Sequence, residues 1–292
     1  GDHRDLHSFP TRRSSDLQDG FQFNISVGYD LEGIKTPKID AFIEGMKEAK
    51  DTAVFKECQE WLLDHTDLFQ HVNAEDIKRI PSAVCNSATI STLHGCPPKE
   101  IESIADYLLK EKHLNTFIKC NPTLLGYEFA RKTMDEMGYD YMAFGDFHFL
   151  DDLQYEDAVP MLTRLIELSG QLGLEFGVKI TNTFPVDVTR GELPSEEMYM
   201  SGKSLFPLSI SLAAKLSAQF KGKLRIAYSG GADYYNIDKI VSCGVWPVTV
   251  ATTLLKPGGY QRFTQMAEKV MEKPLEKWQG VQVEKLSALA EE

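Results

Sequence analysis

Two kinds of hydrophobic pattern alternate along this chain. Short runs of β-prone apolar residues predict buried strands, and segments with apolar residues every three or four positions predict amphipathic helices. Six strands are expected, at 21–27, 83–91, 114–120, 175–181, 224–228 and 246–251. Helices are expected between and after them, at 39–49, 53–63, 98–108, 128–137, 158–172, 208–220, 235–242 and 266–277. This alternation predicts an α/β protein with a parallel sheet.

Two segments lack either pattern and are expected to be long loops. Residues 140–152 are aromatic and acidic, and residues 185–207 are punctuated by proline and glycine. The helix expected at 53–63 has Val54, Cys58 and Trp61 on one face. An apolar face of this kind predicts a helix packed on the core, with Cys58 buried in it.

Polar residues follow the last two expected strands at the point where each strand ends. Ser229, Gly230 and Gly231 come after the fifth strand, and Ala251, Thr252 and Thr253 end the sixth. Neighbouring parallel strands end at the same edge of a sheet, so we expect these residues to form one concave patch of amide and hydroxyl donors suited to a phosphate. Each turn alone is also compatible with an ordinary tight turn or polar loop.

The phosphate cup favours a barrel over an open sheet, because (β/α)₈ barrels bind phosphate after strands 7 and 8. No G-x-G-x-x-G follows the first strand, which weakens a dinucleotide-binding interpretation. The fold expected is therefore a (β/α)₈ TIM barrel. Six strands are two short of eight, so we expect its first strands to be missing.

Composition narrows the classes of function. The 292 residues carry a net charge of −12, which disfavours a nucleic-acid or anionic-membrane surface. Five scattered cysteines without a C-x-x-C motif predict neither disulfides nor an iron–sulfur or zinc site, and indicate a reducing cytoplasm. No apolar run approaches the roughly 18 residues of a membrane span.

The two ends differ from the body of the chain. Residues 1–17 are polar and aperiodic and resemble the translated remnant of a sequencing adapter, so they are left out of the fold prediction. We expect a partial barrel over 18–277. Residues 278–292 are charged and are expected to begin a linker to another domain.

Two lysines and a set of amide and hydroxyl side chains are candidate ligands. Lys119 and Lys179 each lie where a strand meets its C-terminal loop. There a lysine can neutralise a reduced flavin or form a Schiff base, although it can also be an ordinary surface lysine. Asn121 and the run Thr181-Asn182-Thr183 supply donors and acceptors that can bind the amide edge of a ring.

Cys96 is a candidate proton donor. It lies in a Gly-Cys-Pro-Pro turn before an expected helix, where the helix dipole would lower the pKa of its thiol. It is equally compatible with a small buried residue. His94 could assist it. Asp146 and His148 share one loop, but such a pair is weak evidence for a metal, and no metal site is predicted.

Several long motifs resemble one known family. They are STLHGCPPKEIESIADYL, FIKCNPTLLGYEFARK, FGVKITNTFPV, EMYMSGKSLFPLSI, YSGGADYYNI and ATTLLKPGGY. Together they resemble the selenate reductase subunit family, large flavo-iron-sulfur proteins related to dihydropyrimidine dehydrogenase. The resemblance implies a dihydroorotate-dehydrogenase-like barrel that carries FMN.

The resemblance also implies roles for individual residues. Lys119 is similar to the flavin-contacting lysine of those dehydrogenases, and the Thr181–Thr183 run to their strand end facing flavin and substrate. The turns at 229–231 and 251–253 are similar to their phosphate-binding turns. Cys96 resembles a catalytic-loop cysteine, so Cys96 and Asn182 are the expected catalytic residues.

The function expected is that of a flavin-dependent oxidoreductase. Electrons from NADPH would arrive through FAD and 4Fe–4S clusters on segments absent from this chain, and FMN would pass them to a small acceptor such as selenate or a heterocyclic ring. One alternative is a flavin-free, phosphate-binding aldolase or synthase that uses a lysine Schiff base. Another is a barrel that serves only to dock other domains.

Overall fold

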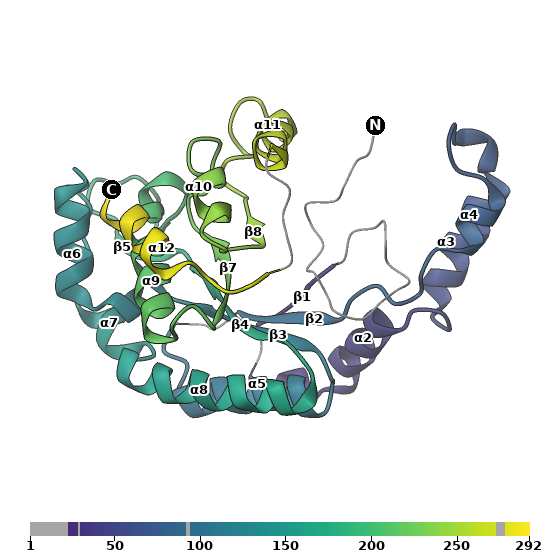
Figure 1. Ribbon diagram of the computed structural model, residues 1–292, viewed down its shortest axis with the longest axis horizontal. Helices are drawn as coiled ribbons and strands as arrows, with labels where there is room; N and C mark the ends of the chain where they lie inside the picture. Colours follow the sequence, from purple (N-terminus) through teal and green to yellow (C-terminus); the bar gives the residue numbers. More distant parts are fainter. Residues whose placement is uncertain (1–22, 29, 92–93, 273–277) are drawn as a thin grey trace.

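A curled parallel sheet forms the centre of the molecule (Figure 1). The computed structural model describes residues 23–28, 30–91, 94–272 and 278–292. Within them the sheet has the order β1-β2-β3-β4-β7-β8, with every pair of neighbours parallel. Its strands are β1 Ile25–Val27, β2 Ser87–Ser91, β3 Asn115–Cys120, β4 Phe176–Ile180, β7 Arg225–Ser229 and β8 Val248–Thr249. The six expected strands are confirmed, and the architecture is an incomplete (β/α)₈ barrel.

Helices connect the strands and cover the outer face of the sheet. The longer helices are α2 Pro37–Lys47, α3 Ala53–Asp64, α5 Pro98–Lys110, α6 Tyr127–Glu136, α8 Tyr155–Leu172, α9 Phe206–Gln219, α11 Tyr260–Met271 and α12 Val283–Glu291. The short ones are α1 Leu31–Ile34, α4 Ala74–Lys78, α7 Phe147–Asp151 and α10 Ile237–Ser242. Short 3-10 helices lie at Thr66–Leu68, Pro122–Leu125 and Gly202–Leu205.

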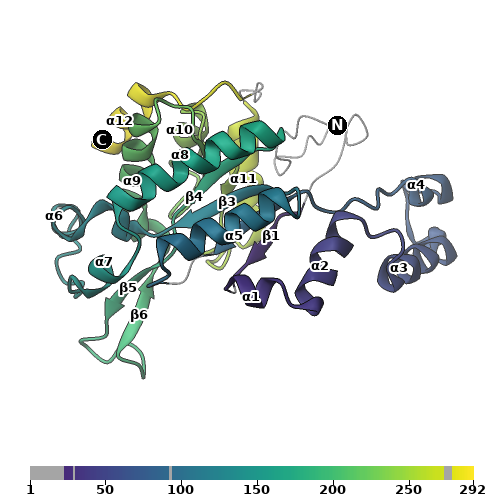
Figure 2. The ribbon, with the colours of Figure 1, turned by 90° about the horizontal axis from the view of Figure 1, so that it is seen from below.

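The outer face of the sheet packs against α5 and α8, which lie side by side (Figure 2). Ile90, Ile118 and Val178 occupy neighbouring register positions on β2, β3 and β4, and all are buried in the common core. Helix α5 begins at Pro98, where a missing amide hydrogen does no harm. Its predicted apolar face is buried as expected.

The next register position belongs to the inner face. Ser91, Lys119, Lys179 and Ala227 are paired in a row across β2, β3, β4 and β7. Successive side chains along a strand point to opposite faces. Because the isoleucine row faces the helices, the row with the two lysines faces the interior of the barrel.

Both segments expected to be long loops contain regular structure. Helix α7 lies within 140–152, and the strands β5 Phe184–Asp187 and β6 Glu197–Met200 form an antiparallel hairpin within 185–207. The hairpin projects from the body of the molecule (Figure 2). Its strands have four residues each, too few for alternation to show clearly.

The end of the chain also differs from the expectation of a linker. Within 278–292, helix α12 packs along α9, and its Leu286 is fully buried. Residues 1–17, expected to be non-native, lie outside the described residues.

The prediction that Cys58 is buried is wrong. Helix α3 contains no buried residue, Cys58 is exposed, and Val54 and Trp61 are 66% and 51% exposed. Thr52 caps the helix, and α3 packs on α4 in an arm that projects from the body (Figure 1). The apolar face is real, but the described part of the chain does not cover it with core.

Among the described residues, none of the helices has the length and apolar character needed to cross a membrane.

Candidate functional site

Two lysines stand side by side inside the barrel. Lys119 of β3 and Lys179 of β4 are direct partners in the parallel register, and both are half-buried. Burial lowers the pKa of Lys119. The pKa of Lys179 falls to about 8, first because of burial and second because of repulsion from Lys119. The interior of the barrel therefore holds two cations whose charge a bound anion would stabilise.

Asn121 and Asn182 extend this site beyond the strand ends. The side-chain amide of Asn182 donates to Asn121 Oδ1 at 2.8 Å, and the Asn182 backbone amide donates to Cys120 O at 2.8 Å. Asn121 is buried. The ends of β3 and β4 are thus joined by hydrogen bonds two and three residues beyond the lysines.

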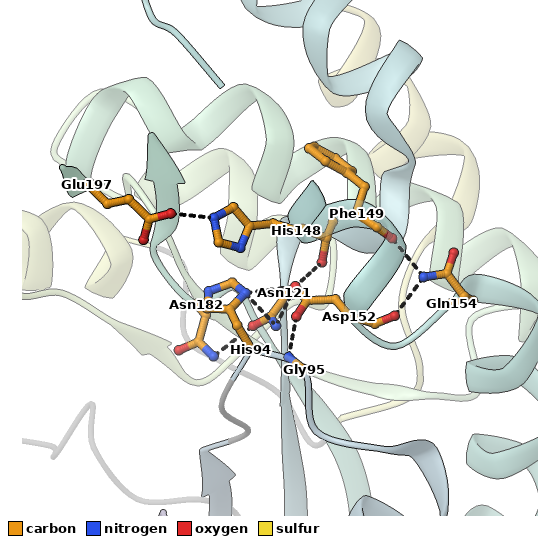
Figure 3. Close-up of polar contacts among 10 residues, drawn as sticks. His94, Gly95, Asn121, His148, Phe149, Asp152, Gln154, Asn182 and Glu197 are labelled. Atoms are coloured by element: carbon orange, nitrogen blue, oxygen red, sulfur yellow. Dashed lines mark hydrogen bonds and ion pairs between the residues drawn. The ribbon is translucent and has the colours of Figure 1, made fainter. Parts of the chain in front are cut away.

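A buried carboxylate, Asp152, anchors the loop between β2 and α5 (Figure 3). It accepts hydrogen bonds from His94 Nδ1 at 2.7 Å, Gly95 N at 2.8 Å, Thr123 Oγ1 at 2.8 Å and Asn121 Nδ2 at 3.0 Å. Burial alone would raise the pKa of Asp152, but these donors lower it below its ordinary value. Asp152 therefore remains ionised.

The expectation of a lowered pKa at Cys96 is wrong. Burial raises the pKa of its thiol, and the nearby carboxylate of Glu100 raises it further. Cys96 packs against the hydrophobic core and lines a small cavity to which Lys119 and Asn121 also contribute, beside apolar residues such as Ile118. The thiol is therefore protonated at neutral pH.

The turn after β7 is pressed against the start of α9. A side chain on Gly230 would lie 2.2 Å from Ser209 Oγ, and one on Gly231 would lie 2.5 Å from Gly202 O. Both glycines also have positive φ, at 139° and 80°. Only glycine fits this turn, and the structure places it next to the 3-10 helix Gly202–Leu205.

The second predicted turn meets the first from the other side. Thr252 packs on Gly202 and its hydroxyl lies 3.4 Å from Ser201 Oγ. Thr253 Oγ1 donates to Ala232 O at 3.0 Å. Ala251 is exposed. The residues of the two predicted turns are therefore brought together, with Ser201 and Gly202 completing a ring of small residues.

The three residues of the Thr181-Asn182-Thr183 run lie in three different environments. Thr181 is buried, and its hydroxyl lies 2.8 Å from Ser209 Oγ, so its side chain holds β4 to α9. Asn182 joins the asparagine pair, and Thr183 is exposed. Of the three, Asn182 has its side chain in the network of polar groups at the rim.

Several residues of the site were not predicted. Asp152 ends a segment that the sequence indicates is a loop, and Ser201 and Gly202 lie in another. Their partners are distant: Asp152 and His94 are 58 positions apart. Runs of polar residues after a strand marked the other candidates, whereas these residues carry no such local signal.

His148 bonds to a carboxylate across the rim. Its Nε2 lies 2.9 Å from Glu197 Oε1 of β6. Within the described ranges, no group of three or more histidine, cysteine, aspartate or glutamate residues is arranged to hold a metal ion.

The residues present fit FMN. The lysine pair offers positive charge to an electron-rich ring, the asparagine pair offers amide groups, and the turns at 229–231 and 251–253 offer small residues and backbone around a phosphate. The chemistry of this donor set matches the three parts of the cofactor.

Sequence comparison places the chain among known proteins. The profile of the family described as "Oxidoreductase YgfK, N-terminal TIM-barrel domain" matches residues 6–292. The "Putative oxidoreductase YgfK" of Escherichia coli K12 is 45% identical over 287 residues, which cover 94% of this chain and 28% of that protein. The protein of the same name in Escherichia coli O157:H7 matches to the same extent. The chain thus spans little more than a quarter of these relatives.

Two solved structures of Eimeria tenella DHODH also align. The ligand-free form has 17% identity and a TM-score of 0.38, covering 75% of this chain and 64% of that chain. The complex with ferulenol has 18% identity and a TM-score of 0.41, covering 70% and 55%. At these scores the two alignments add nothing to the assignment of fold or function.

Proposed function

Because this chain belongs to the family of the N-terminal TIM-barrel domain of oxidoreductase YgfK, we propose that it is an FMN-binding barrel that transfers electrons to a small acceptor. The family supports an oxidoreductase, and the donor set supports the flavin. The flavin would supply hydride or single electrons. The acceptor we propose is selenate or a heterocyclic ring such as a pyrimidine or purine.

The lysine pair is the observation that carries this proposal. Burial and repulsion from Lys119 lower the pKa of Lys179 to about 8, so its charged form is costly and a bound anion would offset that cost. A reduced flavin is such an anion, and its ring is large enough to meet both lysines. Asn121 and Asn182 would then orient the ring or the acceptor, and the turns at 229–231 and 251–253 would hold the phosphate.

The electron donors belong to the part of the proposal that rests on the longer relatives. We propose that FAD, NADPH and ferredoxin-like modules reside on other segments of such a protein and pass electrons to this barrel. All five cysteines are free thiols. That state is compatible with the reducing cytoplasm that we propose as its compartment.

Titration with FMN tests the proposal. The chain should quench FMN fluorescence, and Lys179→Met should weaken binding by about tenfold, the loss of roughly one charge interaction of 1.4 kcal/mol. Lys132→Met is the matched control, because Lys132 is on the outer helix α6 and pairs with Glu136 across one helical turn. No fluorescence change at any concentration of the wild-type chain would contradict the proposal.

A Schiff-base enzyme is a second candidate, because a lysine with a pKa of about 8 is a substantial nucleophile near neutral pH. Borohydride treatment in the presence of dihydroxyacetone phosphate would then add mass to Lys179. Covalent labelling without FMN binding would favour this candidate, and FMN binding without labelling would exclude it for this phosphate ester.

A further inference from the structure

The rim of the barrel contains a histidine–carboxylate pair. The sequence suggested His94 only as an assistant to Cys96 and did not predict Asp152 as its partner. His94 lies in the loop after β2, and Asp152 is the C-cap residue directly after α7. The His94 side chain is 22% exposed, whereas that of Asp152 is 1% exposed. The pair therefore joins an accessible imidazole to a buried anion.

We propose that His94 is the proton-transfer residue of this site, that Asp152 is its positioning residue, and that His94 Nε2 is the atom that exchanges the proton. The proposal rests on the proposed function, because the proton accompanies a hydride given to the acceptor.

The hydrogen bonds fix which nitrogen of His94 carries the proton. Asp152 is an ionised acceptor, so the 2.7 Å contact requires a hydrogen on His94 Nδ1. Asn121 Nδ2 lies 3.3 Å from the same nitrogen, but it also donates to Asp152 Oδ2 at 3.0 Å. In the neutral ring Nε2 is then the basic nitrogen.

The hydrogen bonds of the His94 ring within residues 23–28, 30–91, 94–272 and 278–292 involve Nδ1 alone, which leaves Nε2 without a partner among them. The rings of His148 and Tyr199 lie 5.8 Å and 6.5 Å from the His94 ring between centroids. His148 differs in that its own Nε2 contacts Glu197. The Nε2 atom of His94 can therefore contact a bound acceptor, whereas the Nε2 atom of His148 already contacts Glu197.

The pair is tied directly to the residues that face the flavin site. Asp152 also binds Asn121, which accepts from Asn182, and these asparagines follow Lys119 and Lys179 by two and three positions. Figure 3 shows His94, Asn121 and Asn182 together at the strand ends. An acceptor held by the asparagines would lie next to the imidazole.

The step balances as the addition of one hydride and one proton across a double bond. The hydride carries the two electrons and comes from the reduced flavin of the proposed function. The proton comes from Nε2 of the His94 imidazolium, which becomes a neutral ring that keeps its Nδ1 proton. Solvent then restores the proton on Nε2.

Cys96, the residue predicted for this task, is placed less well. The residue packs against the core and lines a small cavity shared with Lys119 and Asn121, but both burial and Glu100 raise the pKa of its thiol. A thiol there gives up its proton with difficulty. An imidazole held by a carboxylate is the more suitable donor near neutral pH.

The first test needs neither cofactor nor substrate. In nitrogen-15 NMR of the histidine rings, the His94 signals are identified by their loss in His94→Gln. The neutral ring should carry its proton on Nδ1. The Thr123→Val variant should keep this tautomer, because three donors still hold Asp152, whereas Asp152→Asn should lose it. A neutral His94 with its proton on Nε2 would overturn the proposal even if FMN binds.

The second test compares two acceptors with the FMN-loaded, photoreduced chain. Menadione takes up a hydride and a proton, whereas ferricyanide takes up electrons alone. His94→Gln should slow the reaction with menadione by about 100-fold or more and change that with ferricyanide less than about twofold. His148→Gln is the neighbouring control and should leave both rates within about twofold.

Three outcomes overturn the proposal. An equal loss with both acceptors would indicate a damaged flavin site, and no loss with menadione would remove His94 from proton transfer. A wild-type chain that reduces neither acceptor would contradict the proposed function, and the proton-transfer role with it.

Discussion

At the scale of single residues, the site is defined by charges that the barrel holds at a cost. Lys119 and Lys179 are register partners with lowered pKa values, and Asp152 is a buried carboxylate that four donors keep ionised. Positive and negative charge are thus separated by the asparagine pair. This polarity suits a site that binds an electron-rich ring and delivers a proton to its partner.

Replacing Lys179 should stabilise the chain without cofactor. Lys179 has a folded-state pKa of about 8, below its ordinary value of 10.5, so folding penalises its charged form. Lys179→Met should therefore raise the free energy of unfolding at pH 7 by about 1–3 kcal/mol. Urea denaturation of both proteins measures this difference.

The stabilisation expected for Lys179→Met should depend on pH. The penalty is complete below pH 8, and the wild type recovers stability as the pH rises from about 8 to 10.5. The advantage of Lys179→Met should thus fall below about 1 kcal/mol at pH 10. A difference independent of pH, or one equal to that of Lys132→Met, would mean that Lys179 is not perturbed.

At the scale of elements, the buried strands and the helix packed on them could be predicted from the sequence. The burial of an amphipathic helix could not, because it depends on which other segment covers the apolar face. The strands β2, β3 and β4 and the helix α5 could be predicted because their apolar residues are dense and periodic. Helix α3 has the same periodicity, but amphipathicity shows only that a face is apolar and does not show what covers it.

The hairpin and the histidine–carboxylate pair were beyond prediction for a different reason. The strands β5 and β6 are too short to produce a clear pattern, and Asp152 meets His94 across 58 positions. Contacts between distant polar residues leave no periodic trace. That the turns at 229–231 and 251–253 lie together was predictable, because each polar run directly follows its strand.

Thiol reactivity should separate Cys58 from the other cysteines. Cys58 is exposed on α3, Cys96 is half-buried, and Cys85, Cys120 and Cys243 are buried. One thiol of the native chain should therefore react rapidly with an Ellman-type disulfide reagent, and Cys58→Ser should remove that phase. The substitution should change the free energy of unfolding by less than about 0.5 kcal/mol. A wild-type chain without a fast phase would show that Cys58 on α3 is covered, and a fast phase that persists in Cys58→Ser would assign it to another thiol.

Helix α12 should be an integral part of the fold. Leu286 is fully buried where α12 packs along α9, so Leu286→Ala should lower the free energy of unfolding by about 2–5 kcal/mol. Glu284→Ala, an exposed change on the same helix, is the control and should change it by less than about 0.5 kcal/mol. Equal, small effects of both would show that 283–291 behave as a linker.

At the scale of the whole molecule, a strongly acidic chain concentrates positive charge at one place inside its barrel. The net charge is −12, yet the inner row of the sheet carries two lysines. The rim above them carries the asparagine pair and His94, and the last two strands carry the small-residue turns. These three sets lie on the inner face and carboxyl edge of one sheet, which is where barrels place their active sites.

The dependence of FMN affinity on pH tests this account most directly. If the flavin is bound by the charged form of Lys179, binding takes up a proton above the pKa of about 8. The dissociation constant should then be about tenfold larger at pH 9 than at pH 7 for the wild-type chain, and nearly constant for Lys179→Met. A wild-type dissociation constant that does not change between pH 7 and pH 9 would contradict the central claim.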